Sequence, residues 1–374
     1  MKRKLMTKII STLLLVTSLG IMSATSVFAA ESSEPTFELP IYGSSGFASI
    51  EINVTYPLRK KVVEVIKPGT AFTILNGTNE SYFKVELLDG KVGYVPKAYT
   101  MINLPDIIPS IVYYPSNSIS SMFRSNQTEI SDLTGNKLYN VKAFNARFNE
   151  VQYVMPVLYS MAIKIQAAQT EALANGDSLK IYETFRPAKT QSEVATKLSK
   201  LMYSNMDVYK AINTYPWSQD WFIASCSSNH QKGRAMDCSL VKVLETETRQ
   251  FRKATYSVVT SYEEYTMPSA MHELSPAAAT FTCGVSKSAW QYATLSDGML
   301  ASEGAQRLQK YCTSNGLTPL ASEWWHFDDL ESNAYGLGGF YLLGGGPDED
   351  GEIHEVFNNT SRKQIHFSKN PQRC

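Results

Sequence analysis

Residues 82–96, YFKVELLDGKVGYVP, contain two runs of alternating polar and apolar residues on either side of Asp89-Gly90. Side chains of a β-strand point alternately to the two faces of a sheet, and Asp-Gly is a favoured hairpin turn. This stretch therefore predicts a β-hairpin. Residues 62–66 and 71–75 have the same character and flank Pro68-Gly69, so the pattern predicts a small all-β domain.

The segment KPGTAFTIL, residues 67–75, followed by residues 82–96, resembles bacterial SH3-like domains. The resemblance covers residues 41–104. It implies a small barrel that holds an attached enzyme on cell-wall peptide. Four aromatic residues then offer a contact surface for that peptide, or else form the core of a barrel that is only a spacer: Tyr82, Phe83, Tyr94 and Tyr99.

The first 30 residues have the three-part layout of a secretory signal peptide. Four basic residues precede an apolar run from Ile9 to about Met22, and Ala29 and Ala30 supply the small residues of a cleavage site. An uncleaved membrane anchor is the alternative, although Ser and Thr residues dilute the run. Residues 31–40 predict a linker. We therefore expect a secreted protein, extracellular or associated with the cell wall, with no membrane contact after cleavage.

The charge of the mature chain argues against nucleic acid as a partner. Cleavage would remove four of the 35 basic residues and none of the 35 acidic residues, which leaves a net charge of −4. Nucleic-acid-binding domains carry a basic surface instead. The remaining length of about 344 residues exceeds one typical domain, so we expect two domains.

The region after residue 104 mixes helices and strands without regular alternation, which indicates an α+β domain over residues 105–374. Apolar residues at helical spacing from Val154 to Ala172 predict a helix that stops at Asn175-Gly176. Residues 179–184 predict a strand. Residues 302–315 predict a second helix, which Ser302 caps. A glycine-rich run, Gly344 to Gly351, predicts a mobile loop in a C-terminal extension.

Two short segments concentrate groups that bind metals: SNHQKGRAMD, residues 228–237, and EWWHF, residues 323–327. A catalytic zinc ion needs three protein ligands of the His and carboxylate type and an open fourth position. The segments supply such a set, which is His230, Asp237 and His326. Between the first two, Gly233 permits a tight turn that returns the chain toward His230. Either segment alone would more commonly be a surface pair.

Glu323 is the candidate general base for the attack of water on a peptide bond. It lies three residues before His326, and odd offsets along a regular strand point to opposite faces. We therefore expect a bend or bulge between the two residues. Glu323 would take a proton from the attacking water and pass it to the leaving amine. Trp324 and Trp325 would keep the site partly dry.

Three motifs in the same order resemble the D-alanyl-D-alanine zinc peptidases, a family that includes the dipeptidases and carboxypeptidases associated with vancomycin resistance. The first two are SxHxxGxAxD at residues 228–237 and ExWH at residues 323–326. The third is an aromatic-Arg-Pro tripeptide, Phe185-Arg186-Pro187. The resemblance covers approximately residues 108–340. It implies an α+β domain with a central antiparallel sheet, zinc as cofactor and Glu323 as base.

The same resemblance assigns Arg186 to the oxyanion of the tetrahedral intermediate, since a fixed guanidinium offers several donors. A surface salt bridge is the alternative for this residue. We also expect Ser228, His272 and Trp325 to contact the substrate. His272 stands in a segment where the dipeptidases have a Phe-Asp pair whose aspartate binds the free amine. Here the pair is Met271-His272, so the amine-binding carboxylate is missing unless Glu273 replaces it.

This departure favours a carboxypeptidase that acts on longer wall peptides over a strict dipeptidase. The sequence as a whole predicts a secreted zinc metallopeptidase that hydrolyses D-Ala-D-Ala-type bonds of peptidoglycan peptides. Two alternatives stay open. One is an L,D-carboxypeptidase or peptidoglycan endopeptidase on the same scaffold, and the other is a non-catalytic wall-binding protein. The oligomeric state is not predicted.

Overall fold

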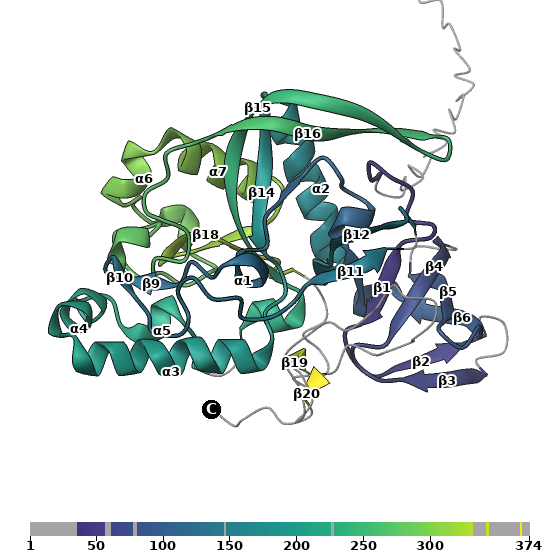
Figure 1. Cartoon of the computed structure of the whole chain (residues 1–374), viewed down its shortest axis with the longest axis horizontal. Helices are drawn as coiled ribbons and strands as arrows, with labels where there is room; N and C mark the ends of the chain where they lie inside the picture. The colour runs from purple at the N-terminus through teal and green to yellow at the C-terminus, as the bar shows by residue number, and fades with distance from the viewer. Residues whose placement is uncertain are drawn as a thin grey trace, which may run out of the picture. The chain divides into compact units, whose positions relative to one another are not determined.

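The computed structural model describes residues 36–56, 61–77, 81–145, 147–225 and 228–331, and the backbone of residues 342–343 and 367–368. Over these ranges the chain is a mixed α and β protein with large antiparallel sheets and seven α-helices (Figure 1). None of the described helices is long and apolar enough to cross a membrane. The expected signal peptide and the glycine-rich run lie outside the described residues.

The N-terminal strands belong to an eight-stranded sheet. They are β1 (Ser45–Ala48), β2 (Ile52–Thr55), β3 (Val62–Ile66), β4 (Ala71–Gly77), β5 (Tyr82–Leu87), β6 (Val92–Pro96), β7 (Thr100–Asn103) and β13 (Pro156–Leu158). Their order is β13-β7-β1-β4-β5-β6-β2-β3. The predicted hairpin is confirmed, because β5 and β6 pair antiparallel on either side of Asp89-Gly90. Gly90 has a φ of +85°, which glycine adopts without strain.

Side chains of this sheet alternate between the core and the surface. On β5, Phe83 and Val85 are fully buried, while Lys84 between them is half-buried and Glu86 is exposed. Phe83 is therefore a core residue. Tyr82 is 40% exposed, and Tyr94 and Tyr99 are half-buried. Only the tyrosines thus leave ring surface available to a partner.

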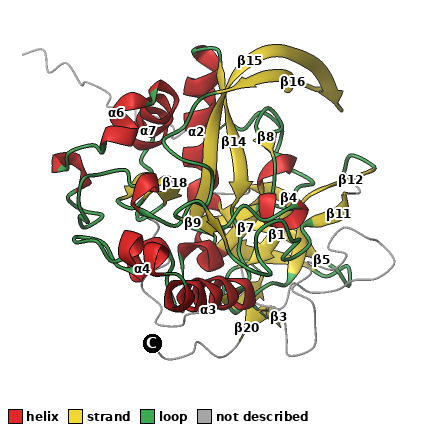
Figure 2. Ribbon diagram, turned by 60° about the vertical axis from the view of Figure 1, so that its left-hand side comes forward, coloured by secondary structure: helices red, strands yellow, loops and turns green. Residues whose placement is uncertain are grey.

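A second sheet of six strands carries the candidate site. Its strands are β8 (Val112–Tyr113), β14 (Asp177–Glu183), β15 (Ala235–Phe251), β16 (Ala254–Glu264), β17 (Thr318–Leu320) and β18 (Glu323–Asp328). The order is β17-β18-β15-β14-β8, and β16 pairs with β15. All pairs are antiparallel except β8 with β14. The strands β15 and β16 run on as a long curved hairpin beyond their neighbours (Figure 2).

Helices cover this sheet and a neighbouring apolar cluster. They are α1 (Ser116–Ile119), α2 (Tyr159–Ala174), α3 (Ala188–Ser204), α4 (Met206–Ile212), α5 (Gln219–Phe222), α6 (Asp297–Ala301) and α7 (Glu303–Ser314). Helix α2 packs on β14, α7 packs on β15, and α2 and α7 touch each other. Helices α3 and α4 pack together and bury a separate cluster that includes Leu198 and Phe222.

The remaining elements are short. The two-stranded pairs are β9 (Arg124–Ser125) with β10 (Thr128–Glu129), β11 (Lys142–Asn145) with β12 (Glu150–Tyr153), and β19 (Leu342–Leu343) with β20 (Phe367–Ser368). The 3-10 turns are η1 (Lys97–Tyr99), η2 (Leu104–Asp106), η3 (Asn229–Lys232), η4 (Pro276–Ala278) and η5 (Trp290–Tyr292). Of these, η3 carries a candidate metal ligand.

Both predicted helices are present, but one begins later than expected. Helix α7 is capped as predicted, since the Ser302 side chain accepts a hydrogen bond from the Ala305 N–H at 3.1 Å. Helix α2 begins at Tyr159 rather than Val154. Pro156 disfavours helical backbone at the residue before it, and residues 156–158 pair with β7 as β13 on the edge of the first sheet.

The two parts of the sequence share a sheet and a core. Strand β13 comes from the second part and pairs with β7 of the first. Residues 36–40, which the sequence assigned to a linker, contain no helix or strand. Within them Leu39 is fully buried and its N–H donates to the Ile107 carbonyl at 3.1 Å. These residues are therefore packed against the protein.

Candidate metal site

Three neighbouring strands place three polar residues in one row. In the pairing of β14 with β15, Glu183 is opposite Asp237, and in the pairing of β15 with β18, Asp237 is opposite His326. Directly opposed residues of adjacent strands have side chains on the same face. All three residues are at most 6% exposed. The sheet therefore brings together residues that lie far apart in the sequence.

His230 reaches the same place from a turn. It lies in η3, which ends at Gly233 with a φ of +65°. This is the tight turn that the sequence predicted. A Cβ at Gly233 would lie 2.7 Å from the Met101 Sδ, and the Gly233 carbonyl accepts a hydrogen bond from the Leu158 N–H at 2.8 Å. Met101 of β7 and Leu158 of β13 thus pack against the turn. Glycine is required at position 233 because its φ is positive and because a side chain there would collide with Met101.

The ligand atoms of the three predicted metal residues form a small triangle. His230 Nε2 is 3.2 Å from His326 Nδ1 and 3.3 Å from Asp237 Oδ1, and His326 Nδ1 is 3.0 Å from Asp237 Oδ1. Such close spacing of two imidazoles and a carboxylate is suited to holding a metal ion. The structure therefore brings the three predicted ligands together. The arrangement of their donor atoms is not specific to one metal.

Each of these side chains is fixed by a partner on its other side. His230 Nδ1 is 3.0 Å from the Thr184 carbonyl, and His326 Nε2 is 3.1 Å from Asp328 Oδ1. Asp237 Oδ2 accepts from His272 Nε2 at 3.1 Å and from Arg186 Nη2 at 3.0 Å. Outer contacts of this kind fix the tautomer and orientation of metal ligands. His230 Nε2, His326 Nδ1 and Asp237 Oδ1 therefore remain directed toward one another, where they are available to bind a metal ion.

Burial and charge act differently on the two histidines. Burial lowers the pKa of His230 against the opposing effect of Asp237, so its imidazole is neutral and able to bind a metal. Burial also opposes a charge on His326, but Asp328 and Asp237 together raise its pKa to about 10. His326 would therefore have to release the proton at Nδ1 in order to hold a metal ion there.

Glu323 faces the same centre because β18 is irregular. In its pairing with β17, Pro319 is opposite Phe327, whereas the next residue, Leu320, is opposite Glu323. The extra residues on β18 form the bulge that the sequence predicted. Glu323 Oε2 lies 3.8 Å from His326 Nδ1. Burial raises the pKa of Glu323 to about 8, with His326 opposing and Asp237 adding to the effect. The carboxylate is therefore a stronger proton acceptor than usual.

Arg186 is held in a buried network. Its Nε and Nη2 both donate to Glu183 Oε2, at 2.8 and 2.5 Å, and its Nη1 donates to Gln191 Oε1 at 2.9 Å. Burial opposes ionisation of Glu183, but Arg186 and two imidazoles hold the pKa of Glu183 below its usual range. Glu183 in turn accepts from Asn117 Nδ2 at 2.5 Å and from the Tyr139 hydroxyl. Arg186 is thus a fixed, buried cation and not the surface salt bridge of the alternative.

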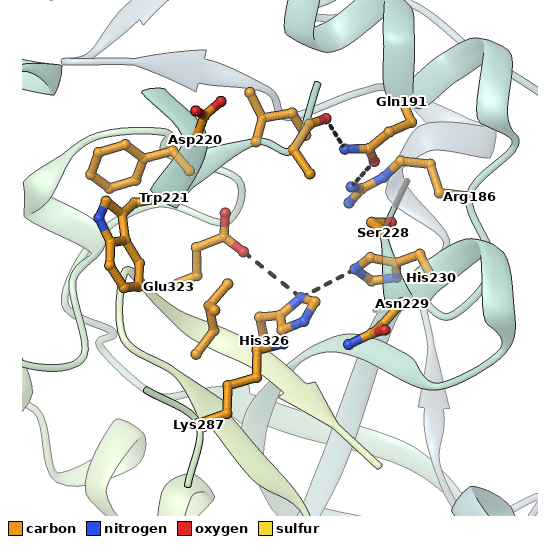
Figure 3. Close-up of a pocket in the computed structure, with 14 residues that line it drawn as sticks. Arg186, Gln191, Asp220, Trp221, Ser228, Asn229, His230, Lys287, Glu323 and His326 are labelled. Atoms are coloured by element: carbon orange, nitrogen blue, oxygen red, sulfur yellow. Dashed lines mark hydrogen bonds and ion pairs between the residues drawn. The ribbon is translucent and has the colours of Figure 1, made fainter. Parts of the chain in front are cut away.

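A pocket of about 300 Å³ opens onto this centre. Figure 3 shows Glu323, His326, His230 and Arg186 around it, with Trp221 on the side of Glu323, across from His230 and Arg186. The residues that line it are Arg186, Gln191, Asp220, Trp221, Phe222, Ile223, Ala224, Ser228, Asn229, His230, Lys287, Leu320, Glu323 and His326. Two candidate metal ligands, acidic side chains and basic side chains thus line one cavity together with apolar residues.

Of the three expected substrate contacts, Ser228 lines this pocket and the other two are elsewhere. His272 is 1% exposed, stacks on Phe123 at 4.5 Å and lies behind Asp237. Trp325 is 1% exposed in the core. Glu273, the suggested replacement for an amine-binding carboxylate, is buried and accepts from the Gln127 N–H at 3.1 Å. His272, Trp325 and Glu273 therefore do not line the pocket.

Sequence reasoning missed Glu183, Asp328 and Lys287. The first two carried a usable signal, because Glu183 lies near the end of a predicted strand, two residues before the Phe-Arg-Pro motif, and Asp328 is two residues after a candidate metal ligand, hence on the same face of β18. Lys287 lies in an irregular segment. No pattern in the sequence pointed to Lys287.

No protein-family model matches the chain, and no curated protein matches it.

Proposed function

We propose that this protein is an exported zinc peptidase that hydrolyses D-Ala-D-Ala-type bonds of peptidoglycan peptides. One observation carries the proposal. The inward atoms of His230, Asp237 and His326 lie 3.0 to 3.3 Å apart, and Glu323 stands beside them at the same pocket. Peptide hydrolysis at a metal needs this combination of an open ligand set and a nearby base.

Zinc suits the spacing of the ligand atoms. In a tetrahedral site with bonds of roughly 2.0–2.1 Å, ligand atoms lie about 3.3 Å apart. The three distances of 3.0, 3.2 and 3.3 Å agree with this value. Two imidazoles and one carboxylate leave a fourth position for water. When bound, zinc supplies a Lewis acid and lowers the pKa of its water to about 7.

The residues around the ion have distinct tasks in this proposal. Glu323 accepts the proton of the attacking water and delivers it to the leaving amine. Arg186 uses four N–H groups on Glu183, Asp237 and Gln191. A guanidinium has five, so one N–H at Nη1 is left to donate to the oxygen on which negative charge develops. Trp221 and Phe222 exclude water from that side of the pocket.

The N-terminal strands fit a bacterial SH3-like module that holds the enzyme on wall peptide. The hairpin of β5 and β6 and the exposed ring of Tyr82 support this assignment. Such a module would raise the local concentration of wall peptide near the zinc site. Peptidoglycan would then be the partner of both parts of the chain.

Zinc analysis and product analysis test the proposal together. Purified protein loaded with zinc is incubated with D-Ala-D-Ala and, in parallel, with a wall pentapeptide. Mass spectrometry then identifies the fragments. Release of D-alanine from either substrate supports the proposal. Tight zinc binding with no product from any wall peptide would instead favour the non-catalytic alternative, and release of a different fragment would favour an endopeptidase or L,D-carboxypeptidase.

A further inference from the structure

Strand β15 has an unpaired backbone edge along its outer half. Lys242 is opposite Asp177 of β14 and also opposite Glu263 of β16, so these two strands flank β15 on opposite sides. Strand β14 begins at Asp177. Residues 244–251 therefore have only β16 as a partner in the part of the chain that the structure describes. The N–H and C=O groups along such an edge are available to another strand.

This edge is exposed along its length but held at both ends. Residues 244–250 are all exposed, and the strand continues at one end into the buried sheet. At the tip of the hairpin, the Phe251 ring lies 5.2 Å from the Phe148 ring, and the Arg252 guanidinium lies 4.9 Å from the centre of the Tyr42 ring. A second strand would meet an edge that is already ordered, which lowers the entropy cost of association.

The charges along the edge are complementary to those of a second copy that runs in the opposite direction. Register shifts occur next to Glu245, but residues 246–250, TETRQ, pair regularly with β16. In a twofold antiparallel pair centred on Thr248, Glu247 of each copy is opposite Arg249 of the other copy. Opposite charges that face each other directly stabilise antiparallel strands, and so does a Thr–Thr pair.

The same sequence disfavours the neighbouring registers. Opposed side chains in an antiparallel pair share a face, so the twofold axis has to pass through a residue. An axis through Glu247 or Arg249 would place two like charges opposite each other, which is destabilising. The free edge of β16 offers no charge match, because its charged residues, Glu263 and Glu264, are both acidic. The charge pattern therefore selects the β15 edge and one register.

Charges on an edge strand more commonly keep it from pairing with another chain. Here the charges of opposite sign alternate along one face instead of repelling a second copy. Within one chain, Glu247 and Arg249 form an ion pair at 2.9 Å, and their side chains are still 54% and 44% exposed. Each side chain is therefore able to meet an additional opposite charge from a second copy.

We propose that two copies of this protein form a twofold dimer in which the outer edges of β15 pair antiparallel through residues 246–250, centred on Thr248. The two hairpins then join into one continuous sheet. The inference does not rest on the proposed function, because it needs neither zinc nor peptide hydrolysis. One short strand pair buries less than the standard interface of roughly 1,600 Å². We therefore expect a weak dimer that dissociates on dilution and at high salt.

Sedimentation equilibrium of the intact protein over a range of concentrations tests the dimer. The wild type should shift from one chain to two as the concentration rises. Glu247→Arg and Arg249→Glu each place like charges at both opposed pairs, so each should raise the Kd of the dimer by about 10- to 100-fold. Glu263→Arg makes the same charge change on β16 and serves as the matched control, with the Kd of the wild type.

Mixing the two variants gives a readout that is specific to the twofold register. In a mixed pair, two arginines of one copy face two glutamates of the other. An equimolar mixture should therefore dimerise with about the Kd of the wild type, and so should the double variant Glu247→Arg/Arg249→Glu. Circular dichroism confirms that each variant is folded.

Three results would overturn the inference. The first is a wild type that stays a single chain at every concentration. The second is a dimer that neither single substitution weakens, since the contact would then lie on another surface. The third is a mixture of the two variants that dimerises no better than either variant alone.

Discussion

The two halves of β15 differ sharply in environment, although one continuous strand forms both. Residues 235–241 are all buried, pair with β14 and β18, and carry Asp237. Residues 244–250 are all exposed and pair with β16 in the long hairpin (Figures 1 and 2). The inner half holds a candidate metal ligand between partners on both sides. The outer half pairs with β16 in a long ladder that has register shifts next to Glu245, and its alternating charged residues face water.

The difference shows that a regular strand does not create a site by itself. Backbone pairing sets the direction of Asp237, but His230, His272 and Arg186 arrive from outside its strand and fix its oxygens. On the outer half, Glu247 and Arg249 form an exposed ion pair at 2.9 Å, which contributes little to stability. Mutations on the two halves should therefore have effects of very different size.

The largest effect is expected from His230→Ala. It removes one of three metal ligands and leaves a buried cavity, so zinc should be lost and activity should fall by about 1000-fold or more. Elemental analysis and peptide turnover measure the two effects. Thr248→Ala on the outer half is the control and should keep both. Full zinc content in His230→Ala would contradict the assignment of this ligand.

Glu323→Gln should separate catalysis from metal binding. The amide keeps the shape of Glu323 but cannot accept the proton of water, so turnover should fall by about 100- to 10,000-fold. Zinc content should stay at the wild-type level, because Glu323 is not one of the three ligands. Wild-type turnover in this variant would refute the role of Glu323 as base.

A pair of matched substitutions tests the two halves for stability. Leu240 is fully buried on the inner half, and Leu244 is 55% exposed on the outer half. Leu240→Ala should reduce the free energy of unfolding by about 2–5 kcal/mol, whereas Leu244→Ala should change it by about 0.5 kcal/mol or less. Urea unfolding of both variants measures the two changes in the free energy of unfolding. Equal losses would mean that the outer half is packed against something in solution.

The smallest expected effect at the site comes from Asp328→Asn. The amide preserves the contact with His326 in shape but removes the charge that orients its imidazole. Zinc affinity should fall by about 10- to 100-fold, with the fold intact. Competition with a chelator measures the affinity, and circular dichroism controls for folding. An affinity equal to that of the wild type would show that Asp328 is not needed to hold His326.

Several local features followed from the sequence because they depend on neighbouring residues. The hairpin at Asp89-Gly90, the cap at Ser302 and the tight turn at Gly233 are as expected, and the bend or bulge expected between Glu323 and His326 is a bulge. The start of α2 was placed too early, because Val154 and Leu158 fit a helical period but pair or pack as extended chain around Pro156. Tertiary pairing outweighed the local pattern there.

The sequence by itself determined the candidate ligands and base, since the required residue types occur in two short segments with fixed spacing. It did not determine how these side chains are held. Glu183, Asp328 and His272 acquire their positions from the pairing of three strands and from a loop that packs behind Asp237. Contacts between distant segments depend on how buried surfaces fit in three dimensions, and local spacing carries no record of that fit. The tertiary structure therefore decided which partners fix each candidate ligand and that Lys287 lines the pocket together with Arg186.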